Sequence, residues 1–199
     1  MIKRLVLASK NPGKLRELQA LLQSFELTVI PQDDLDIQEA PEPHFTFVEN
    51  ALAKARNAAL HSELPALADD SGLCVNALGG APGVISAHYA GEPRSDLRNN
   101  QKLVFDLQGV EDRRAHYYCV LVLVRFAQDP EPLITEGRWD GEIILSPRGQ
   151  EGFGYDPYFY LPERGCTAAE LAIKDKNRVS HRAQALAQLL VRLRTNALV

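Results

Sequence analysis

The sequence predicts an α/β fold within one domain of two lobes that spans residues 1–199. Short apolar runs of strand length alternate with segments in which leucines and alanines recur at helical spacing. Hydrophobic residues make up 45% and charged residues 24% of the chain, which is an ordinary globular composition. A chain of 199 residues suffices for a sizeable core, and no internal repeat or low-complexity linker divides it.

The first strand and helix are predicted near the N-terminus. Leu5 to Ala8 is a short apolar run that is typical of a buried strand. Asn11 and Pro12 then favour a helix start, because Asn is a good N-cap and Pro is favoured in the first turn. We therefore expect a helix over residues 12–23 and a second strand over residues 26–31.

A second helix is followed by another strand. Thr46 and Glu49 form the T-x-x-E pattern of a capping box, so the alanine-rich segment from 50 to 60 is expected to be helical. The segment from 64 to 68 is expected to form a strand that ends at Asp69.

The middle of the chain combines a loop, a helix and the most apolar strand. The Gly- and Pro-rich stretch from 78 to 83 predicts a loop. Ser95 is expected to cap a helix whose inward residues are Leu97, Val104 and Leu107. The segment from 117 to 126 is rich in β-branched and aromatic residues and predicts a central strand.

The last third of the chain is predicted to add two strands and a long helix. Strands near 133–138 and 141–145 suggest a hairpin or an antiparallel extension, and a glycine-rich loop covers 149–157. Thr167 and Glu170 form a second capping box. Ser180 is expected to cap the final helix, whose apolar face comprises Leu186, Leu189, Leu190 and Leu193.

Charge and cysteine usage exclude several classes of protein. The net charge of −4 disfavours a general nucleic-acid-coating role. Cys74, Cys119 and Cys166 are isolated from one another, which argues against a zinc ribbon and fits a reducing compartment. The longest apolar run, from 117 to 124, is far shorter than the roughly 18–20 residues of a membrane span. We expect a cytoplasmic protein that binds neither nucleic acid nor membranes.

Two polar segments that follow predicted strands are candidate sites. Ser9-Lys10-Asn11-Pro12-Gly13-Lys14 lies between a strand and a helix, where backbone N–H groups and the helix dipole attract anions. The alternative is an ordinary turn with exposed lysines. Asp69-Asp70-Ser71 could hold Mg²⁺ or activate water, although adjacent residues of an extended strand point to opposite faces. The alternative there is a turn, which Asp, Ser and Gly all favour.

Two later segments could bind a ring and its polar edge. In Gly152-Phe153-Gly154-Tyr155-Asp156-Pro157, flanking glycines allow an aromatic ring to be presented for stacking on a base. The alternative is a glycine-rich turn with Phe153 in the core. The segment from Lys174 to Arg182 is cationic and offers the donors of Arg182 and the titratable ring of His181. Ser180 could equally be only a helix cap within a solvated face.

Together these segments resemble the inosine triphosphate pyrophosphatase family, whose members hydrolyse noncanonical purine nucleoside triphosphates. The resemblance covers nearly the whole chain. Its motifs, in the order of the family, are Ser9 to Lys14, Thr46-Phe47 with Glu49-Asn50-Ala51, Ala68 to Leu73, Leu78 to Gly83, Phe153 to Pro157, and Ser180-His181-Arg182. Each motif is weak alone, whereas six in order are specific.

The resemblance implies a fold, an activity and an assembly. The fold would be a long mixed central β-sheet flanked by helices, in two lobes with the nucleotide in a cleft between them. The activity would be Mg²⁺-dependent hydrolysis of ITP, dITP and XTP between the α- and β-phosphates, which yields the nucleoside monophosphate and pyrophosphate. This would remove deaminated purines from the nucleotide pool. The protein would usually be a homodimer.

The resemblance also implies a role for each matching residue. The segment from Ser9 to Lys14 would contact the triphosphate, and Ser71 and Lys176 would contact the substrate. Asp70 would be the proton acceptor and a magnesium ligand, and the neighbouring acidic residue Asp69 would be a further candidate metal ligand. Phe153, Gly154, Tyr155 and Asp156 would form the base-binding loop, with Phe153 stacked on the base. His181 and Arg182 would read the 6-oxo edge of the purine.

One segment departs from the family pattern. The family usually has Glu-Thr-Gly before the Thr-Phe pair, and this chain has Glu42-Pro43-His44 there. Glu42 still matches the acidic position and is a candidate second metal ligand, with Glu39 nearby.

Base selection would follow from hydrogen-bond complementarity. Arg182 only donates and His181 can donate, so both suit the acceptor oxygen at C6 of hypoxanthine rather than the amine of adenine. Two alternatives remain open. One is a Maf-type pyrophosphatase with another base preference, against which the Phe153 loop and the Ser180-His181-Arg182 segment speak. The other is a nucleotide sensor without catalysis, which the intact Asp69-Asp70 pair disfavours.

Overall fold

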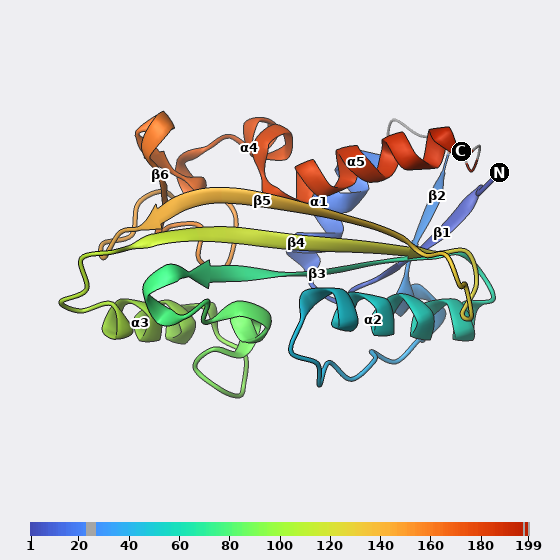
Figure 1. Cartoon of the computed structure of the whole chain (residues 1–199), viewed down its shortest axis with the longest axis horizontal. Helices are drawn as coiled ribbons and strands as arrows, with labels where there is room; N and C mark the ends of the chain where they lie inside the picture. Colours follow the sequence, from blue (N-terminus) through green and yellow to red (C-terminus); the bar gives the residue numbers. More distant parts are fainter. Residues whose placement is uncertain (23–26, 197, 199) are drawn as a thin grey trace. The chain divides into compact units, whose positions relative to one another are not determined.

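The computed structural model describes residues 1–22, 27–196 and 198 of the chain (Figure 1). Seven strands form one sheet in the order β2-β1-β3-β4-β5-β6-β7. The strands are β1 (Arg4–Ala8), β2 (Thr28–Pro31), β3 (Ala66–Val75), β4 (Arg114–Val124), β5 (Leu133–Ile143), β6 (Phe159–Leu161) and β7 (Cys166–Thr167). The α-helices are α1 (Pro12–Leu22), α2 (Phe47–Ser62), α3 (Asp96–Asp106), α4 (Ile173–Val179) and α5 (His181–Thr195).

The sheet is mixed. Strand β1 pairs in parallel with β2 and with β3, whereas β6 pairs antiparallel with β5 and with β7. The predicted α/β fold with a mixed, helix-flanked sheet is therefore confirmed. The expected ends of the first helix at 23 and of the second strand at 26 lie outside the described residues.

The chain divides into two compact units. Unit 1 comprises 1–70, 119–137 and 182–199, and unit 2 comprises 71–118 and 138–181. Strands β3, β4 and β5 each contribute residues to both units. That the chain is a single two-lobed domain stays a prediction.

Unit 1 has helices on both faces of its part of the sheet. Figure 1 shows α1 and α5 on one side of these strands and α2 on the other. Leu121 and Leu123 of β4 belong to the same buried cluster as Leu18 of α1 and Leu186 of α5. Because side chains alternate along a strand, the neighbouring residue Val122 points to the opposite face, on the side of α2. The alanine-rich face of α2 lets that helix pack closely.

Unit 2 has its own core. Leu103 of α3 and Leu107, the C-cap residue of that helix, belong to one buried cluster with Tyr117, Trp139 and Phe159 of the sheet. The aromatic rings contact one another, with 4.6 Å between the ring centroids of Tyr117 and Phe159. Such tilted aromatic pairs are favourable beyond the area that they bury.

The predicted end of the third strand at Asp69 was wrong, because β3 continues to Val75. Asp69 and Asp70 are 1% and 4% exposed, within the strand. Their carboxylates are accommodated there by lysine partners, Lys14 for Asp69 and Lys54 for Asp70. Turn-forming residues therefore lie in a central strand, where buried ion pairs replace hydration.

The two predicted strands at 133–138 and 141–145 are one strand, β5. The break expected at 139–140 is absent, and the strand continues through Gly141. A Cβ atom at this position would lie 2.6 Å from the carbonyl oxygen of Tyr160 and 2.7 Å from the ring of Phe159. Gly141 is thus required by the close approach of β6, because a side chain at this position would collide with that strand.

The inward face predicted for the third helix was right at Leu107 and wrong at Leu97, and Val104 is half-buried. Leu97 is 68% exposed, whereas Leu103 and Leu107 are fully buried. The buried residues in the first half of α3 are instead Asn99 and Asn100. These two amides precede Leu103 at helical spacing and share its face.

No helix within the described ranges is long and apolar enough to cross a membrane.

Candidate active site

Asp69 and Asp70 point to opposite faces of β3, as expected for adjacent residues of an extended strand. Asp69 forms ion pairs with Lys14 of α1 and Arg182 of α5. Asp70 forms an ion pair with Lys54 of α2. The aspartate pair therefore belongs to two different clusters within unit 1. The half-buried Ser71, a predicted substrate contact, follows in the same strand.

The Asp70 cluster joins two carboxylates through one ammonium group. Lys54 Nζ lies 2.9 Å from Asp70 Oδ1 and 2.9 Å from Glu42 Oε2. Asn50 Nδ2 donates a hydrogen bond of 3.4 Å to Asp70 Oδ2, and Asn50 also bonds the backbone of His44, which follows Glu42 by two residues. Two of the three predicted metal ligands, Glu42 and Asp70, thus converge on a single cation, whereas Asp69 does not.

Burial and charge shift the pKa values in this cluster. Burial raises the pKa of Asp70 above its ordinary value, although the charge of Lys54 opposes the shift. Burial alone would lower the pKa of Lys54, but the carboxylates of Asp70 and Glu42 outweigh it, so the pKa of Lys54 is raised. At neutral pH the lysine is therefore cationic.

Glu42 and Asp70 are a suitable donor pair for a hard divalent cation. Among the described residues, no three His, Cys, Asp or Glu side chains gather as a metal site. Mg²⁺ nevertheless requires only one or two protein carboxylates, because waters and substrate phosphates complete its octahedral shell. In the structure, the two carboxylates already bind one cationic group, the ammonium of Lys54.

The Asp69 cluster is a buried network of charges. Asp69 accepts from Arg182 Nε at 2.8 Å and from Cys119 Sγ at 3.2 Å, and Lys14 Nζ lies 2.6 Å away. Burial alone would raise the pKa of Asp69, but Arg182 and Lys14 hold it well below its usual range. Arg182 Nη1 also pairs with Glu17 of α1. The network joins β3, α1, β4 and α5.

Arg182, which was predicted to read the purine, is only 1% exposed. Its Nε and Nη1 groups both donate to carboxylates, those of Asp69 and Glu17. Burial alone would lower the pKa of Arg182, but these carboxylates raise it. The guanidinium is therefore a permanent charge in the core of unit 1.

The predicted phosphate segment surrounds the start of α1. Asn11 Oδ1 accepts from the backbone N–H groups of Gly13 at 2.9 Å and Lys14 at 3.3 Å, which confirms Asn11 as a helix cap. Ser9 Oγ accepts from Asn11 N at 3.2 Å. Some of the amides expected to face an anion are thus used by the cap. Lys10 is exposed and lies 3.6 Å from Asp33.

The predicted base loop of unit 2 is organised by Asp156. Asp156 Oδ2 accepts from Phe153 N at 2.9 Å and from Lys176 Nζ at 2.6 Å, and Tyr117 OH donates to Oδ1 at 3.2 Å. A Cβ atom at Gly152 would lie 2.1 Å from Asp156 Oδ2, so only glycine fits there. Lys176 Nζ lies 4.9 Å from the centroid of the Phe153 ring, a cation–π contact.

His181 belongs to the aromatic core of unit 2. Its ring stacks on Tyr117, with 4.8 Å between centroids and 11° between planes, and lies 6.5 Å from Trp139. Because Tyr117 also donates to Asp156, the predicted base-edge residue His181 and the predicted base loop are connected through one phenol. This connection lies entirely within unit 2.

The sequence-based reasoning missed Lys54 as a site residue. The signal was present, because Lys54 lies four residues after Asn50, on a helix face otherwise made of Ala51, Ala55 and Ala58. A charged residue on such an apolar face must find a buried partner. Glu17 and Tyr117 were missed as well, and nothing in their local sequence indicates the partners that they find.

Comparisons with known proteins agree over nearly the full length. A sequence model of the Ham1 family matches residues 5–192. A curated relative from Nitrosomonas europaea, named dITP/XTP pyrophosphatase, is 62% identical over 98% of this chain and 97% of its own length. A relative of that name from Ralstonia nicotianae is 64% identical over 97% of this chain and 98% of its own. The solved structure of a HAM1 protein from Coxiella burnetii is similar, with a TM-score of 0.90, 48% identity, and coverage of 98% of this chain and 100% of that one.

Proposed function

The chain belongs to the Ham1 family, and we propose that it hydrolyses dITP, ITP and XTP to the nucleoside monophosphate and pyrophosphate. The geometric observation that carries this proposal is the convergence of Glu42 and Asp70 on one cation. Hydrolysis of a phosphoanhydride requires concentrated positive charge and an activated water, and this cluster offers groups for both. The chain is therefore a nucleoside triphosphate pyrophosphatase, a hydrolase.

The triphosphate would bind at the start of α1. Lys10 is exposed, and Lys14 forms an ion pair with Asp69, with Lys14 Nζ 2.6 Å from Asp69 Oδ1. Ser9 and Asn11 add polar side chains at the same helix end. In a protein of net charge −4, these local cations and the helix dipole supply the attraction for a polyanion.

Glu42 and Asp70 would hold Mg²⁺, with Asp69 excluded from that pair because it points to the other face of β3. When bound, the ion supplies positive charge that offsets the phosphate charge and orients the attacking water. Lys54 and Asn50 hold the Asp70 carboxylate in place. Asp70 then accepts the proton of the water, as a buried general base.

The base would bind at the loop of unit 2. The ring of Phe153 is half-buried and its backbone is anchored by Asp156, which suits a stacking platform. Lys176 and His181 add groups that can donate to an acceptor oxygen at C6, where adenine instead has a donor amine. Arg182 would contact the base edge only while its guanidinium stays hydrogen-bonded to the buried carboxylates of Asp69 and Glu17.

The test is phosphorus NMR of the purified protein with Mg²⁺ and dITP, with ATP and GTP in parallel. We expect pyrophosphate and dIMP from dITP and little turnover of ATP or GTP. Orthophosphate with dIDP would overturn the proposed bond cleavage. Preferred turnover of another nucleotide would favour a Maf-type enzyme, and binding without turnover would favour a sensor.

The homodimer and the cytoplasmic location are proposed on the family resemblance. Light scattering coupled to size-exclusion chromatography would test the homodimer, because a molar mass equal to that of one chain would contradict it. Both leave the catalytic proposal unchanged.

A further inference from the structure

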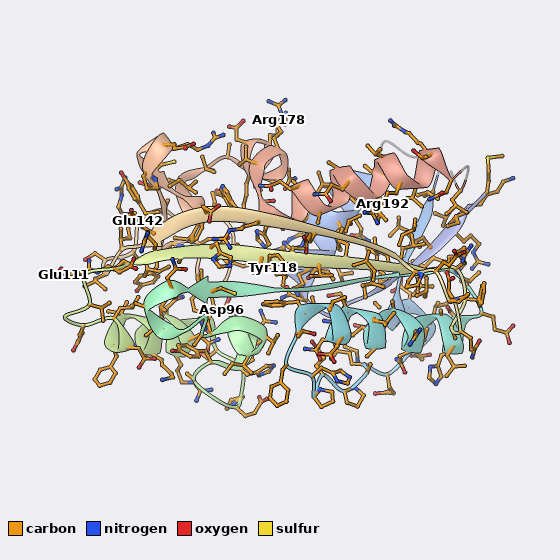
Figure 2. The ribbon with its side chains drawn as sticks, viewed as in Figure 1. Asp96, Glu111, Tyr118, Glu142, Arg178 and Arg192 are labelled. Atoms are coloured by element: carbon orange, nitrogen blue, oxygen red, sulfur yellow. The ribbon has the colours of Figure 1, made fainter. Side chains whose placement is uncertain are left out.

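Helix α3 holds both polar groups of Gly154 in the predicted base loop. Asp96 Oδ2 accepts a hydrogen bond of 3.0 Å from Gly154 N, and Asn100 Nδ2 donates one of 2.9 Å to Gly154 O. Asp96 and Asn100 are four residues apart and therefore share one face of the helix. Figure 2 labels Asp96 at the start of α3. All three residues belong to unit 2.

The neighbours of Gly154 are anchored to other parts of unit 2. Phe153 N donates to Asp156 Oδ2 at 2.9 Å, and Tyr155 OH donates to the carbonyl oxygen of Ser86 at 2.7 Å. Gly154 itself adopts a left-handed φ of +63° and has no side chain with which to anchor the loop. Its position therefore depends on partners for its backbone, and α3 supplies one for its N–H and one for its C=O.

Packing does not explain why position 100 is an asparagine. Asn100 is only 7% exposed and lies on the helix face of Leu103, where a leucine would bury apolar area. Its Oδ1 atom is buried and has no hydrogen-bond partner among the described residues. A buried acceptor without a partner is unfavourable, so the amide needs a compensating role. The hydrogen bond from Nδ2 to Gly154 is the one contact that a leucine could not make.

We propose that Asp96 and Asn100 are positioning residues that fix the Gly154 peptide and thereby determine how tightly and how selectively the loop binds a purine base. This inference rests on the proposed function. The residues act through the loop, because a shift of the Gly154 peptide moves the adjacent Phe153 ring. A stacking ring that samples several positions binds a base less tightly, and a preorganised one binds it more tightly.

The proposal predicts an effect at one end of the nucleotide only. Loss of the clamp weakens binding of the base, whereas groups of unit 1 that are proposed to bind the phosphates keep their positions. dIMP, which carries the base, and inorganic tripolyphosphate, which does not, therefore report separately on the two ends. A merely structural role of α3 would weaken both or neither.

The experiment compares Asn100→Leu and Asp96→Leu with the wild-type protein. We measure KM and kcat for dITP, inhibition constants for dIMP and tripolyphosphate, and the melting temperature. Loss of one hydrogen bond should raise the KM for dITP and the inhibition constant of dIMP about 3- to 10-fold. The inhibition constant of tripolyphosphate should stay within about twofold. The preference for dITP over ATP should fall by a similar factor as the affinity for dIMP.

Three further variants make the result specific. Asp96→Asn keeps an acceptor for Gly154 N and should retain most of the wild-type affinity for dIMP. Asn100→Asp replaces the donor with a carboxylate that repels Gly154 O, so it should weaken dIMP binding even if Asn100→Leu does not fold. Gln101→Leu lies on the exposed side of the same helix and should change neither constant.

Unchanged dIMP inhibition in Asn100→Leu, Asn100→Asp and Asp96→Leu would overturn the proposal. Equal weakening of dIMP and tripolyphosphate would overturn it too, because that pattern indicates general damage to the fold. Failure of the proposed function would look different, since the wild-type protein would then release no pyrophosphate from dITP.

Discussion

Lys54 Nζ lies 2.9 Å from Asp70 Oδ1, and this buried ion pair connects α2 to the centre of β3. The same nitrogen lies 2.9 Å from Glu42 Oε2. A single lysine therefore offsets the repulsion between the two carboxylates, and its charge opposes the rise in the pKa of Asp70 to which burial and Glu42 contribute. A divalent cation that binds these carboxylates would compete with Lys54 for them.

The first prediction concerns Asp70. Asp70→Asn keeps the size of the side chain but removes the base, so kcat for dITP should fall about 100-fold or more. The variant should still fold, because Lys54 keeps Glu42 as a partner, and its affinity for tripolyphosphate should change little. Steady-state kinetics with and without Mg²⁺ measure the effect. Near-normal kcat in this variant would refute the assignment of Asp70 as proton acceptor.

The second prediction concerns Lys54. Lys54→Met leaves two carboxylates without their cation, and removal of one partner of a buried ion pair costs about 3–5 kcal/mol of stability. Added Mg²⁺ should then raise the melting temperature of Lys54→Met more than that of the wild type, because the ion replaces the lost charge. Calorimetry at several Mg²⁺ concentrations measures this.

The double variant Lys54→Met with Asp70→Asn is the matched control for that measurement. It lacks one of the two proposed ligands and should lose the additional stabilisation by Mg²⁺. If all three proteins respond equally to the ion, Glu42 and Asp70 do not hold it.

The third prediction separates two roles of Arg182. Arg182→Ala leaves Asp69 and Glu17 without the guanidinium and should lower the free energy of unfolding by about 3–5 kcal/mol. It should also narrow the preference for ITP over ATP. Urea denaturation and kcat/KM for both nucleotides measure the two effects. Loss of stability with an unchanged nucleotide preference would show that Arg182 only supports the fold.

The fourth prediction concerns pH and the turn between β4 and β5. Asp129 is fully buried and accepts from Arg125 N at 2.9 Å, Arg125 Nε at 2.8 Å and Glu131 N at 3.0 Å. These hydrogen bonds, first those from the Arg125 side chain, hold the pKa of Asp129 well below its ordinary value. The unfolded chain therefore binds the proton more readily than the folded one.

The stability from Asp129 should be fully present above its ordinary pKa of about 4 and should be lost as the pH falls below that value. Asp129→Asn should lower the free energy of unfolding by about 2–3 kcal/mol at pH 7 and by less at pH 3. Urea denaturation across this range tests the sign. A difference that stays constant down to pH 3 would contradict it, and the exposed Asp34→Asn variant controls for net charge.

Local signals in the sequence predicted the elements whose ends are determined locally. Thr46 caps α2, accepting from Glu49 N at 3.3 Å, and Thr167 and Glu170 form the expected capping box. Ser95 caps α3, accepting from Arg98 N at 3.3 Å. In each case the interacting groups are three residues apart, so local chain geometry suffices. The family resemblance is confirmed as well, because its motifs are read directly from the residues.

Predictions failed where a distant segment determines the local structure. The Asp69 to Gly72 stretch has the composition of a turn, and it forms a strand because lysines from α1 and α2 neutralise its aspartates. The break expected at 139–140 does not occur, and the next residue, Gly141, is a glycine because β6 passes close to it. Neither cause is visible in the neighbouring residues.

For the candidate site, the sequence by itself determined the family, the activity class and the residue types that serve it. Alternation along β3 also determined that Asp69 and Asp70 face opposite ways. The tertiary structure decided which partners they meet, Arg182 and Lys14 for the one and Lys54 for the other. The physical reason is that a buried charge is stable only beside an opposite charge, and elements far apart in the sequence supply it.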